Sequence, residues 1–378
     1  MPTTQDGFAW AALTRAPELT VPRLATALET LGGPTGILGA SDAMRARAGL
    51  SPATRAFLAS GEAQPTAAEQ RWLQAPNHAL LGVTDPAFPN LLRAIGDAPI
   101  ALYVDGCAGA LSTPQLAIVG SRNPTAQGRD TAYAFAKYLS QQGLTITSGL
   151  AMGIDTQAHR GALAGTGATV AVLGSGIDVI YPGENAALAA SIAARGALIS
   201  EFPLGTPPRR EHFPRRNRMI AALALGTLVV EAARRSGSLI TARLAGEYGR
   251  EVFAIPGSIH NPLARGCHAL IRQGATLTES ADDVLRELRF SANSGVAVPA
   301  PAADAPDAAE PPGMDKDHKI LLDALGFDPA DVDTLVARTG FKAEAVSSMM
   351  LILELEGHVQ AAPGGRYSRV ARSGWSER

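Results

Sequence analysis

A cluster of arginines around one phenylalanine carries the residue types best suited to hold a polyanion. The segment PRREHFPRRNR, residues 208–218, contains five arginines and one acid, so its local charge is +4 in a chain whose formal net charge is -2. Phe213 stands among these cations. Single-stranded nucleic acid is bound by this combination, because the charges follow the phosphates while a base stacks on the ring. We therefore expect Arg210 and Phe213 to contact nucleic acid or a nucleotide, and a bare solvated surface is the weaker alternative.

The end of this segment has two possible uses. Arg216, Asn217 and Arg218 precede the apolar run MIAALALG, which predicts a helix that starts at the triplet. All three side chains are candidates for strand binding. Asn217 is equally suited to capping the predicted helix, so part of the triplet is expected to serve local structure.

A glycine-rich loop supplies a second candidate anion site. In QLAIVGSRNPTAQGRD, residues 115–130, an apolar strand runs into Gly120, Ser121 and Arg122 and then into an amphipathic helix. This arrangement aims unpaired backbone N–H groups at one place, and the planar guanidinium of Arg122 suits a phosphate. The alternative is that Gly120 only permits a tight turn between strand and helix.

Two further loops repeat the pattern. Ser148 and Gly149 begin SGLAMGID after one predicted strand, and GSGID follows the strand TVAVL. Loops at the carboxyl ends of parallel strands line the crevice where open α/β sheets bind ligands. The third loop matches a dinucleotide fingerprint only in part, because Val179 replaces its last glycine, and the chain has no P-loop signature. No cofactor is expected.

The elements that position these residues divide the chain into four parts. Short helices broken by Gly and Pro fill residues 1–75 and suggest a small SAM-like helical domain. Strands and helices alternate over residues 76–290, which predicts an α/β domain with an extended Rossmann-like, doubly wound and mostly parallel sheet. Residues 291–312 form an Ala/Pro-rich linker. Residues 313–378 give three helical patterns and a hairpin, as in a winged-helix domain.

Composition narrows the class further. The C-terminal part has more acids than bases, which favours a protein-contacting or regulatory role over groove reading. Cys107 and Cys267 form no Cys-x-x-Cys pair, so neither a zinc site nor a disulfide scaffold is expected, and no other metal cluster stands out. No apolar stretch is long enough to cross a membrane, and we expect a cytoplasmic protein.

Catalysis is the weaker interpretation. Glu231 follows the strand TLVV and is the candidate carboxylate of an enzyme acting on nucleoside monophosphates, but no partner acid, His or metal cluster accompanies it. His159 is expected to be a structural histidine. A third possibility is a scaffold whose winged helix recruits partners.

The phrases IVGSR, SGLAMGIDTQAH, VLGSGIDVIYPGEN, ISEFPLGTPP, HFPRRNRMIA, VVEAARRSGSLITA and EVFAIPGS resemble, in this order, the DNA processing protein A family, DprA or Smf. They cover about half of the chain. The resemblance implies a non-catalytic protein that binds single-stranded DNA during natural transformation. It would protect incoming strands and load the RecA recombinase past single-strand binding protein.

The resemblance also implies residue roles. The family's loop arginine falls on Arg122, its basic residue on Arg210 and its phenylalanine on Phe213. Family members form homodimers through the C-terminal part of the Rossmann domain, which here includes His260, Leu270 and Ile271. His268 stands where the family is expected to have Asn.

Overall fold

The computed structural model describes residues 4–259, 261–290, 316–325 and 329–370. Its central domain is built on a nine-stranded sheet with the order β1-β2-β6-β5-β4-β3-β7-β8-β9. The strands from β6 to β9 pair in parallel, while β1 and β2 pair antiparallel and extend the β6 edge. This confirms the mostly parallel sheet. The strands are β1 His78–Gly82, β2 Ala101–Gly106, β3 Gln115–Val119, β4 Thr145–Ser148, β5 Thr169–Val172, β6 Ala197–Ser200, β7 Gly226–Val229, β8 Glu251–Ala254 and β9 Thr276–Leu277.

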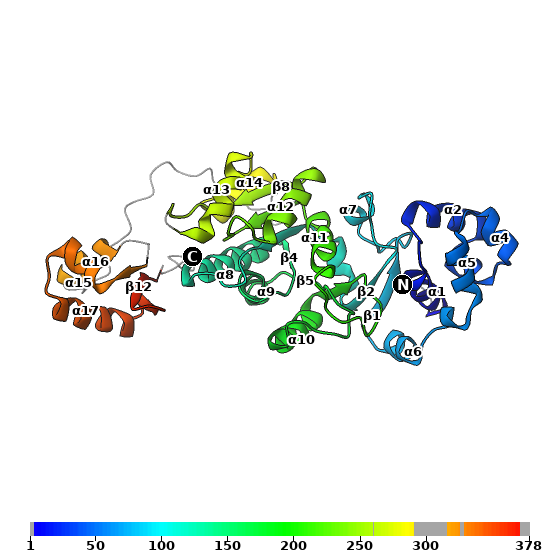
Figure 1. Ribbon diagram of the computed structural model, residues 1–378, viewed down its shortest axis with the longest axis horizontal. Coiled ribbons are helices and arrows are strands. Elements are labelled where there is room, and N and C mark those ends of the chain that lie inside the picture. Colours follow the sequence, from blue (N-terminus) through cyan, green and yellow to red (C-terminus); the bar gives the residue numbers. More distant parts are fainter. Residues whose placement is uncertain (1–3, 260, 291–315, 326–328, 371–378) are drawn as a thin grey trace.

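Helices cover both faces of this sheet (Figure 1). Successive residues of a strand point to opposite faces, and β3 shows the consequence: Leu116 and Ile118 enter one core, Ala117 and Val119 the other. The first core is closed by α8, α9 and α14, and the second by helices that include α10 to α13. The helices are α7 Asn90–Arg93, α8 Ala126–Gln141, α9 Ile154–Ala164, α10 Ala186–Arg195, α11 His212–Leu223, α12 Ser238–Glu247, α13 Arg265–Arg272 and α14 Ala281–Glu287.

The order of the strands sets the position of the site. From β3 the chain adds β4, β5 and β6 on one side, then returns to place β7, β8 and β9 on the other. The direction of winding therefore reverses between β3 and β7. At such a switch point the loops after the two strands diverge and leave a crevice at their carboxyl ends.

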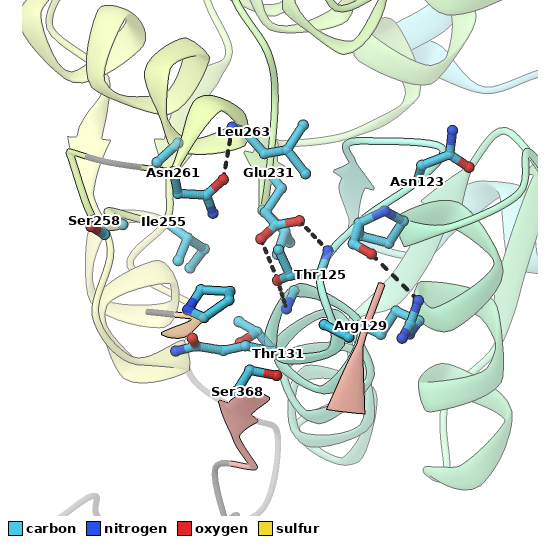
Figure 2. A pocket seen from close by; sticks show the side chains of 18 of the residues that line it. Asn123, Thr125, Arg129, Thr131, Glu231, Ile255, Ser258, Asn261, Leu263 and Ser368 are labelled. Carbon is cyan, nitrogen blue, oxygen red and sulfur yellow. Dashed lines mark hydrogen bonds between the residues drawn. The ribbon is translucent and has the colours of Figure 1, made fainter. Parts of the chain in front are cut away.

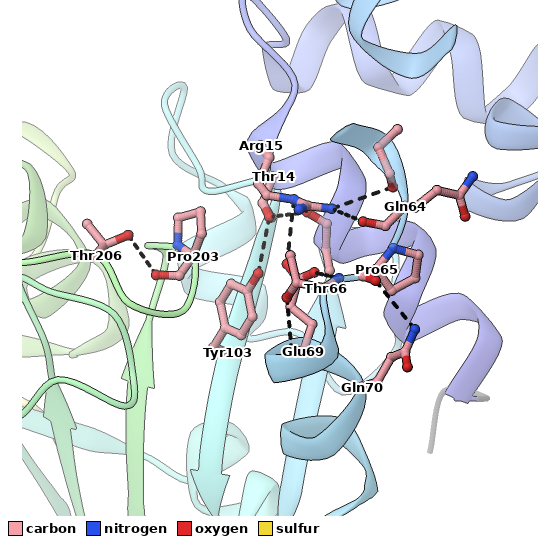
Figure 3. Close-up of polar contacts among 12 residues, drawn as sticks. Thr14, Arg15, Gln64, Pro65, Thr66, Glu69, Gln70, Tyr103, Pro203 and Thr206 are labelled. Carbon is pink, nitrogen blue, oxygen red and sulfur yellow. Dashed lines mark hydrogen bonds and ion pairs between the residues drawn. The ribbon is translucent and has the colours of Figure 1, made fainter. Parts of the chain in front are cut away.

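The N-terminal helices pack against the β1 edge of the sheet through α1 and β1, and both contribute to one core. Figure 3 shows the polar contacts at this junction: Arg15 pairs with the buried Glu69 at 3.5 Å and donates to the carbonyl of Gln64 at 3.1 Å. The Tyr103 hydroxyl of β2 lies 3.4 Å from that of Thr14, and burial raises the pKa of Tyr103 to about 12. The helices are α1 Thr4–Arg15, α2 Val21–Leu31, α3 Pro34–Gly39, α4 Asp42–Arg47, α5 Pro52–Ala59 and α6 Ala67–Gln74.

Two of these helices differ from expectation. The segment GGPTG, expected as a turn, opens α3, because Pro34 stands at its first position, where a missing N–H costs nothing. The second is α6, whose capping box joins Thr66 and Glu69.

The C-terminal part is a winged helix with its own core. Leu321, Leu335, Met350 and Leu353 are buried together, and the strands pair in the order β10-β12-β11. The elements are α15 Lys316–Leu325, β10 Ala330–Asp331, α16 Val332–Thr339, α17 Ala343–Leu355, β11 Val359–Ala362 and β12 Arg366–Arg369. The predicted linker, 291–312, lies outside the described residues. Across the described ranges, every helix is too short or too polar to cross a membrane.

Candidate nucleic-acid interface

A cavity of about 310 Å³ lies at the carboxyl ends of the strands on both sides of the switch point. Three neighbouring loops contribute to it: the loop after β3, the loop after β4 and the loop between β7 and α12. The start of α11 closes the fourth side. Its lining residues include Gly120, Arg122, Ala151, Asp155, Phe213, Pro214, Arg216, Asn217, Ser236, Ser238 and Thr241. We call it the Phe213 cavity.

Two guanidinium groups converge on the Phe213 ring. The Cζ atom of Arg122 lies 5.4 Å from the ring centroid, and that of Arg216 lies 6.0 Å from it. Cations are attracted to the face of an aromatic ring at such distances. Gly174 of the third glycine loop leaves room for the ring, since a Cβ atom there would lie 3.1 Å from Cδ1 of Phe213. The first glycine loop and the arginine segment therefore meet at one aromatic side chain.

Arg216 is a buried cation with fixed neighbours. Its Nη1 donates to the carbonyl of Val172 at 3.0 Å, and its Nε has no partner within the described structure. Burial lowers the pKa of the Arg216 guanidinium to about 10, although Asp155 acts in the opposite direction. Arg216 thus remains charged at neutral pH. Because it lines the cavity, its charge acts there in a partly desolvated setting, where it is stronger than in water.

The glycines of the predicted loops are required by close contacts. A Cβ atom on Gly149 would lie 1.5 Å from Nη1 of Arg216, so only glycine leaves room for the guanidinium. Gly149 also donates its N–H to Asp155 at 3.1 Å. A Cβ atom on Gly120 would lie 2.7 Å from the Ile154 side chain. These residues shape the cavity wall rather than project into it.

The two predicted serines have different positions. Ser148 is fully buried and donates its hydroxyl to the carbonyl of Ile118 at 2.6 Å, which ties β4 to β3. Ser121 is half-buried, and its carbonyl accepts the N–H of Ile154 at 3.1 Å. Ser148 therefore supports the site from beneath, whereas Ser121 lies in the loop that carries Arg122.

The arginine segment divides differently from the sequence prediction. Helix α11 begins at His212 rather than at residue 216, so Asn217 lies inside the helix and cannot be its N-cap. Its Nδ2 instead approaches the carbonyl of Gly237 at 3.4 Å, and the residue lines the cavity. Arg210 precedes the helix, is exposed, and does not line the cavity.

Arg218 points away from the Phe213 cavity. It is buried, with its Nη2 2.6 Å from Oε2 of Glu201, whose side chain is 2% exposed, and its Nε 3.4 Å from Asp97. Arg215 reaches the same carboxylate oxygen at 2.9 Å. A buried carboxylate holds its partner strongly, because removal of either one leaves an unpaired charge. Arg218 is thus placed as a structural residue, contrary to its inclusion among the strand-binding candidates.

Sequence reasoning missed two residues of the site. The Tyr181 ring lies 5.9 Å from that of Phe213 and is 49% exposed, so a second aromatic surface adjoins the first. Its signal was an aromatic residue in the third glycine loop, GSGIDVIYPG. Asp155 carries the charge opposite Arg216, and burial raises its pKa above the ordinary value. Nothing in the spacing of the residues pairs Asp155 with Arg216.

Glu231 is engaged in local structure. Its Oε2 accepts the N–H of Thr125 at 2.9 Å and its Oε1 accepts the Thr125 hydroxyl at 2.6 Å, as Figure 2 shows. Thr125 caps α8, so the carboxylate stabilises the start of that helix. Glu231 lines a separate cavity of about 730 Å³, but both of its oxygens are occupied. This geometry gives no support to the alternative of a catalytic carboxylate.

His159 is fully buried on α9, and burial lowers its pKa to about 3. Its Nδ1 lies 2.7 Å from the Thr169 hydroxyl, which itself donates to the carbonyl of Ile146, so Nδ1 carries the proton. The ring is therefore neutral at physiological pH. This geometry agrees with the structural role expected for His159.

The residues expected at a dimer interface cluster on α13. Leu270 is buried within the protomer and belongs to its core, while Ile271 is half-buried. His260 lies outside the described residues. His268 is tied to the carbonyl of Gly257 at 2.9 Å. Of the described pair, Ile271 alone offers appreciable surface for contact with a second copy.

The fold and the site define a Rossmann-like α/β protein with a cationic, aromatic crevice at its switch point and a winged helix after it. Residues 79–289 match the family model described as DNA recombination-mediator protein A, and residues 299–365 match the DprA winged helix domain. The chain belongs to the DprA/Smf family, as the sequence motifs predict.

Comparison with individual relatives agrees. The chain is 45% identical over 303 residues to Protein Smf of Escherichia coli (strain K12), covering 80% of each chain. It is similar to the X-ray structure of DNA processing protein A from Streptococcus pneumoniae, with a TM-score of 0.64, 37% identity and coverage of 76% of this chain and 99% of that one. A Helicobacter pylori DNA processing protein A, described for its single-stranded DNA binding mode, matches with a TM-score of 0.51, 29% identity and coverage of 56% and 95%.

Proposed function

We propose that this protein binds single-stranded DNA in the Phe213 cavity and acts as a recombination mediator without catalysing a reaction. The observation that carries the proposal is the convergence of Arg122 and Arg216 on the Phe213 ring. A base stacks on the ring while the exposed guanidinium of Arg122 follows the phosphate. Tyr181 supplies a neighbouring ring for a second base.

The remaining candidates have distinct roles in this proposal. Arg210, exposed just before α11, attracts the strand as it approaches the cavity. Asn217, Gly120 and Ser121 contribute polar groups beside the ring. Gly149 and Ser148 hold Arg216 and β4 in position. The relative from Helicobacter pylori, whose title names single-stranded DNA binding, supports this assignment of ligand.

The test is fluorescence anisotropy with single- and double-stranded oligonucleotides of equal length across a salt series. The wild-type protein is expected to prefer the single strand, and its log affinity to fall linearly with log salt by about 0.7 per phosphate contact. Arg122→Ala with Arg210→Ala should abolish binding and leave the unfolding midpoint unchanged. Arg243→Ala with Arg286→Ala removes the same charge from exposed helix positions and is the control.

A folded Arg122/Arg210 variant that binds as the wild type does would contradict the proposal. So would equal affinity of the wild-type protein for single and double strands, because stacking on Phe213 needs an unpaired base.

We also propose that the protein acts in the cytoplasm as a homodimer that places RecA on strands coated with single-strand binding protein during natural transformation. Membership of the DprA/Smf family supports this role, and the free thiols of Cys107 and Cys267 suit a reducing compartment. Light scattering should give the mass of two chains. Addition of the protein should shorten the lag of RecA filament growth on coated strands, and an unchanged lag would exclude the loading role.

A further inference from the structure

A second cationic groove lies on the outer side of α13. Its volume is about 210 Å³, and its lining residues are Arg234, Ile259, Arg265, His268 and Arg272. We call it the α13 groove. No carboxylate belongs to its lining within the described part of the chain. The Phe213 cavity and the α13 groove share no lining residue, so the charges of the groove are not explained by the site described above.

The sequence of α13 places three of these side chains together. Arg265, His268 and Arg272 are spaced i, i+3 and i+7, which puts them on one face of a helix. Cys267 and Leu270 occupy the opposite face and are buried in the core. The basic side chains are therefore held outward by the packing of the helix, with their Cα positions fixed.

The fourth cation comes from the loop between β7 and α12. The N–H of Ala232 donates to the carbonyl of Leu263 at 2.7 Å, and the N–H of Gly266 donates to the carbonyl of Ala232 at 2.8 Å. A Cβ atom on Gly266 would lie 2.5 Å from that carbonyl oxygen. This close contact fastens the loop to the start of α13 and so fixes Arg234 beside the helix.

The charges of the groove are not compensated within the protein. Arg234, Arg265 and Arg272 are exposed, and across the ranges that the structure covers none of them has a carboxylate within 4.0 Å. Like charges gathered in one groove repel one another, and an anion relieves this repulsion. Ile259, 73% exposed, adds an apolar surface that suits a sugar or a base.

The groove and the Phe213 cavity adjoin along a single loop. Arg234 lines the groove, while Ser236 and Gly237 line the cavity. The Cα atoms of Arg234 and Ser236 are at most about 7 Å apart. About two nucleotides span that distance at ~3.4 Å per nucleotide. A strand held at Phe213 thus reaches the groove without crossing any other element.

We propose that the α13 groove is a second phosphate-binding site for the same DNA strand. The inference rests on the proposed function, since it extends the path of a strand anchored at Phe213. An acidic peptide satisfies the charge equally well, but a strand is favoured because the groove continues from a site that offers rings to bases. The bound length then exceeds the few nucleotides that the Phe213 cavity alone accommodates.

The test compares Arg265→Ala/Arg272→Ala with the Arg243→Ala/Arg286→Ala control on oligothymidylates of about 6 and about 24 nucleotides. Both variants lose two exposed positive charges. The groove variant should bind the long strand on the order of tenfold more weakly at 0.1 M salt, with a salt slope smaller by about 1.4, and bind the short strand normally. Arg265→Lys/Arg272→Lys should retain most of the slope. The control should resemble the wild type on both strands.

The outcomes separate this inference from the proposed function. Normal binding of the long strand by the groove variant overturns the inference alone, as does an equal loss on both strands. A change in its mass by light scattering assigns the groove to contact between copies and also overturns it. If the wild-type protein binds neither strand, or binds as well without Arg122 and Phe213, the proposed function itself fails.

Discussion

Replacement of Phe213 by alanine tests the stacking platform directly. The ring is half-buried, and it lies 5.4 Å from the Cζ atom of Arg122. Loss of one stacked base costs about 1 to 3 kcal/mol, which corresponds to binding about 5- to 150-fold weaker. The salt slope should hardly change, because no charge is removed. Tyr133→Ala, which removes another partly exposed ring, is the control and should bind normally.

The structure also predicts that Phe213 and Arg122 act together. The guanidinium over the ring leaves it when a base stacks there, and is then free to pair with the adjoining phosphate. A double-mutant cycle with Arg122→Ala, measured by anisotropy at one salt concentration, should therefore show a coupling energy of about 0.5 to 3 kcal/mol. Affinity of folded Phe213→Ala within about twofold of the wild type, or strictly additive losses, would refute this reasoning.

The other predictions concern buried polar groups that support the site. Arg218→Ala should lower the free energy of unfolding by about 3 kcal/mol in urea titrations, because it strips a partner from the buried Glu201, whereas the exposed Arg286→Ala should cost under about 1 kcal/mol; an equal cost for both would be inconsistent with the pairing. Glu231→Gln should cost about 1 kcal/mol of stability and leave strand affinity unchanged, so a selective loss of binding would contradict its structural role. His159 has its pKa lowered from 6.5 to about 3, so the unfolded state binds the extra proton between these values. The stability difference between the wild type and His159→Gln should thus fall by about 1.4 kcal/mol per pH unit as pH drops from 6.5, and a pH-independent difference would show that the histidine is not buried neutral.

The sequence was sufficient for the fold because the relevant signals are local. Alternating strands and helices predict the parallel sheet, and glycine-bearing loops mark its ligand edge. The β1–β2 hairpin was expected to extend the sheet, but its antiparallel pairing with β6 depends on contacts between segments almost 100 residues apart. The turn at GGPTG became a helix because Pro34 fits a first helical turn as well as it fits a loop.

The roles within the arginine segment were not predictable from its composition. Once α11 begins at His212, its phase turns Arg216 toward the cavity and Arg218 toward Glu201. A start four residues later, as the pattern suggested, gives no such distinction. Burial of Arg218 depends on Glu201 at the end of β6 and Asp97 before β2, which no local pattern connects to it.

The most direct test of the account is photocross-linking with an iodouracil-substituted single strand, followed by mass spectrometry of the attached peptides. A halogenated base that stacks on an aromatic ring reacts with that ring, so the account predicts attachment at Phe213, and at Tyr181 as a second position. Cross-links confined to the N-terminal helices or to the winged helix, with none at Phe213, would contradict it.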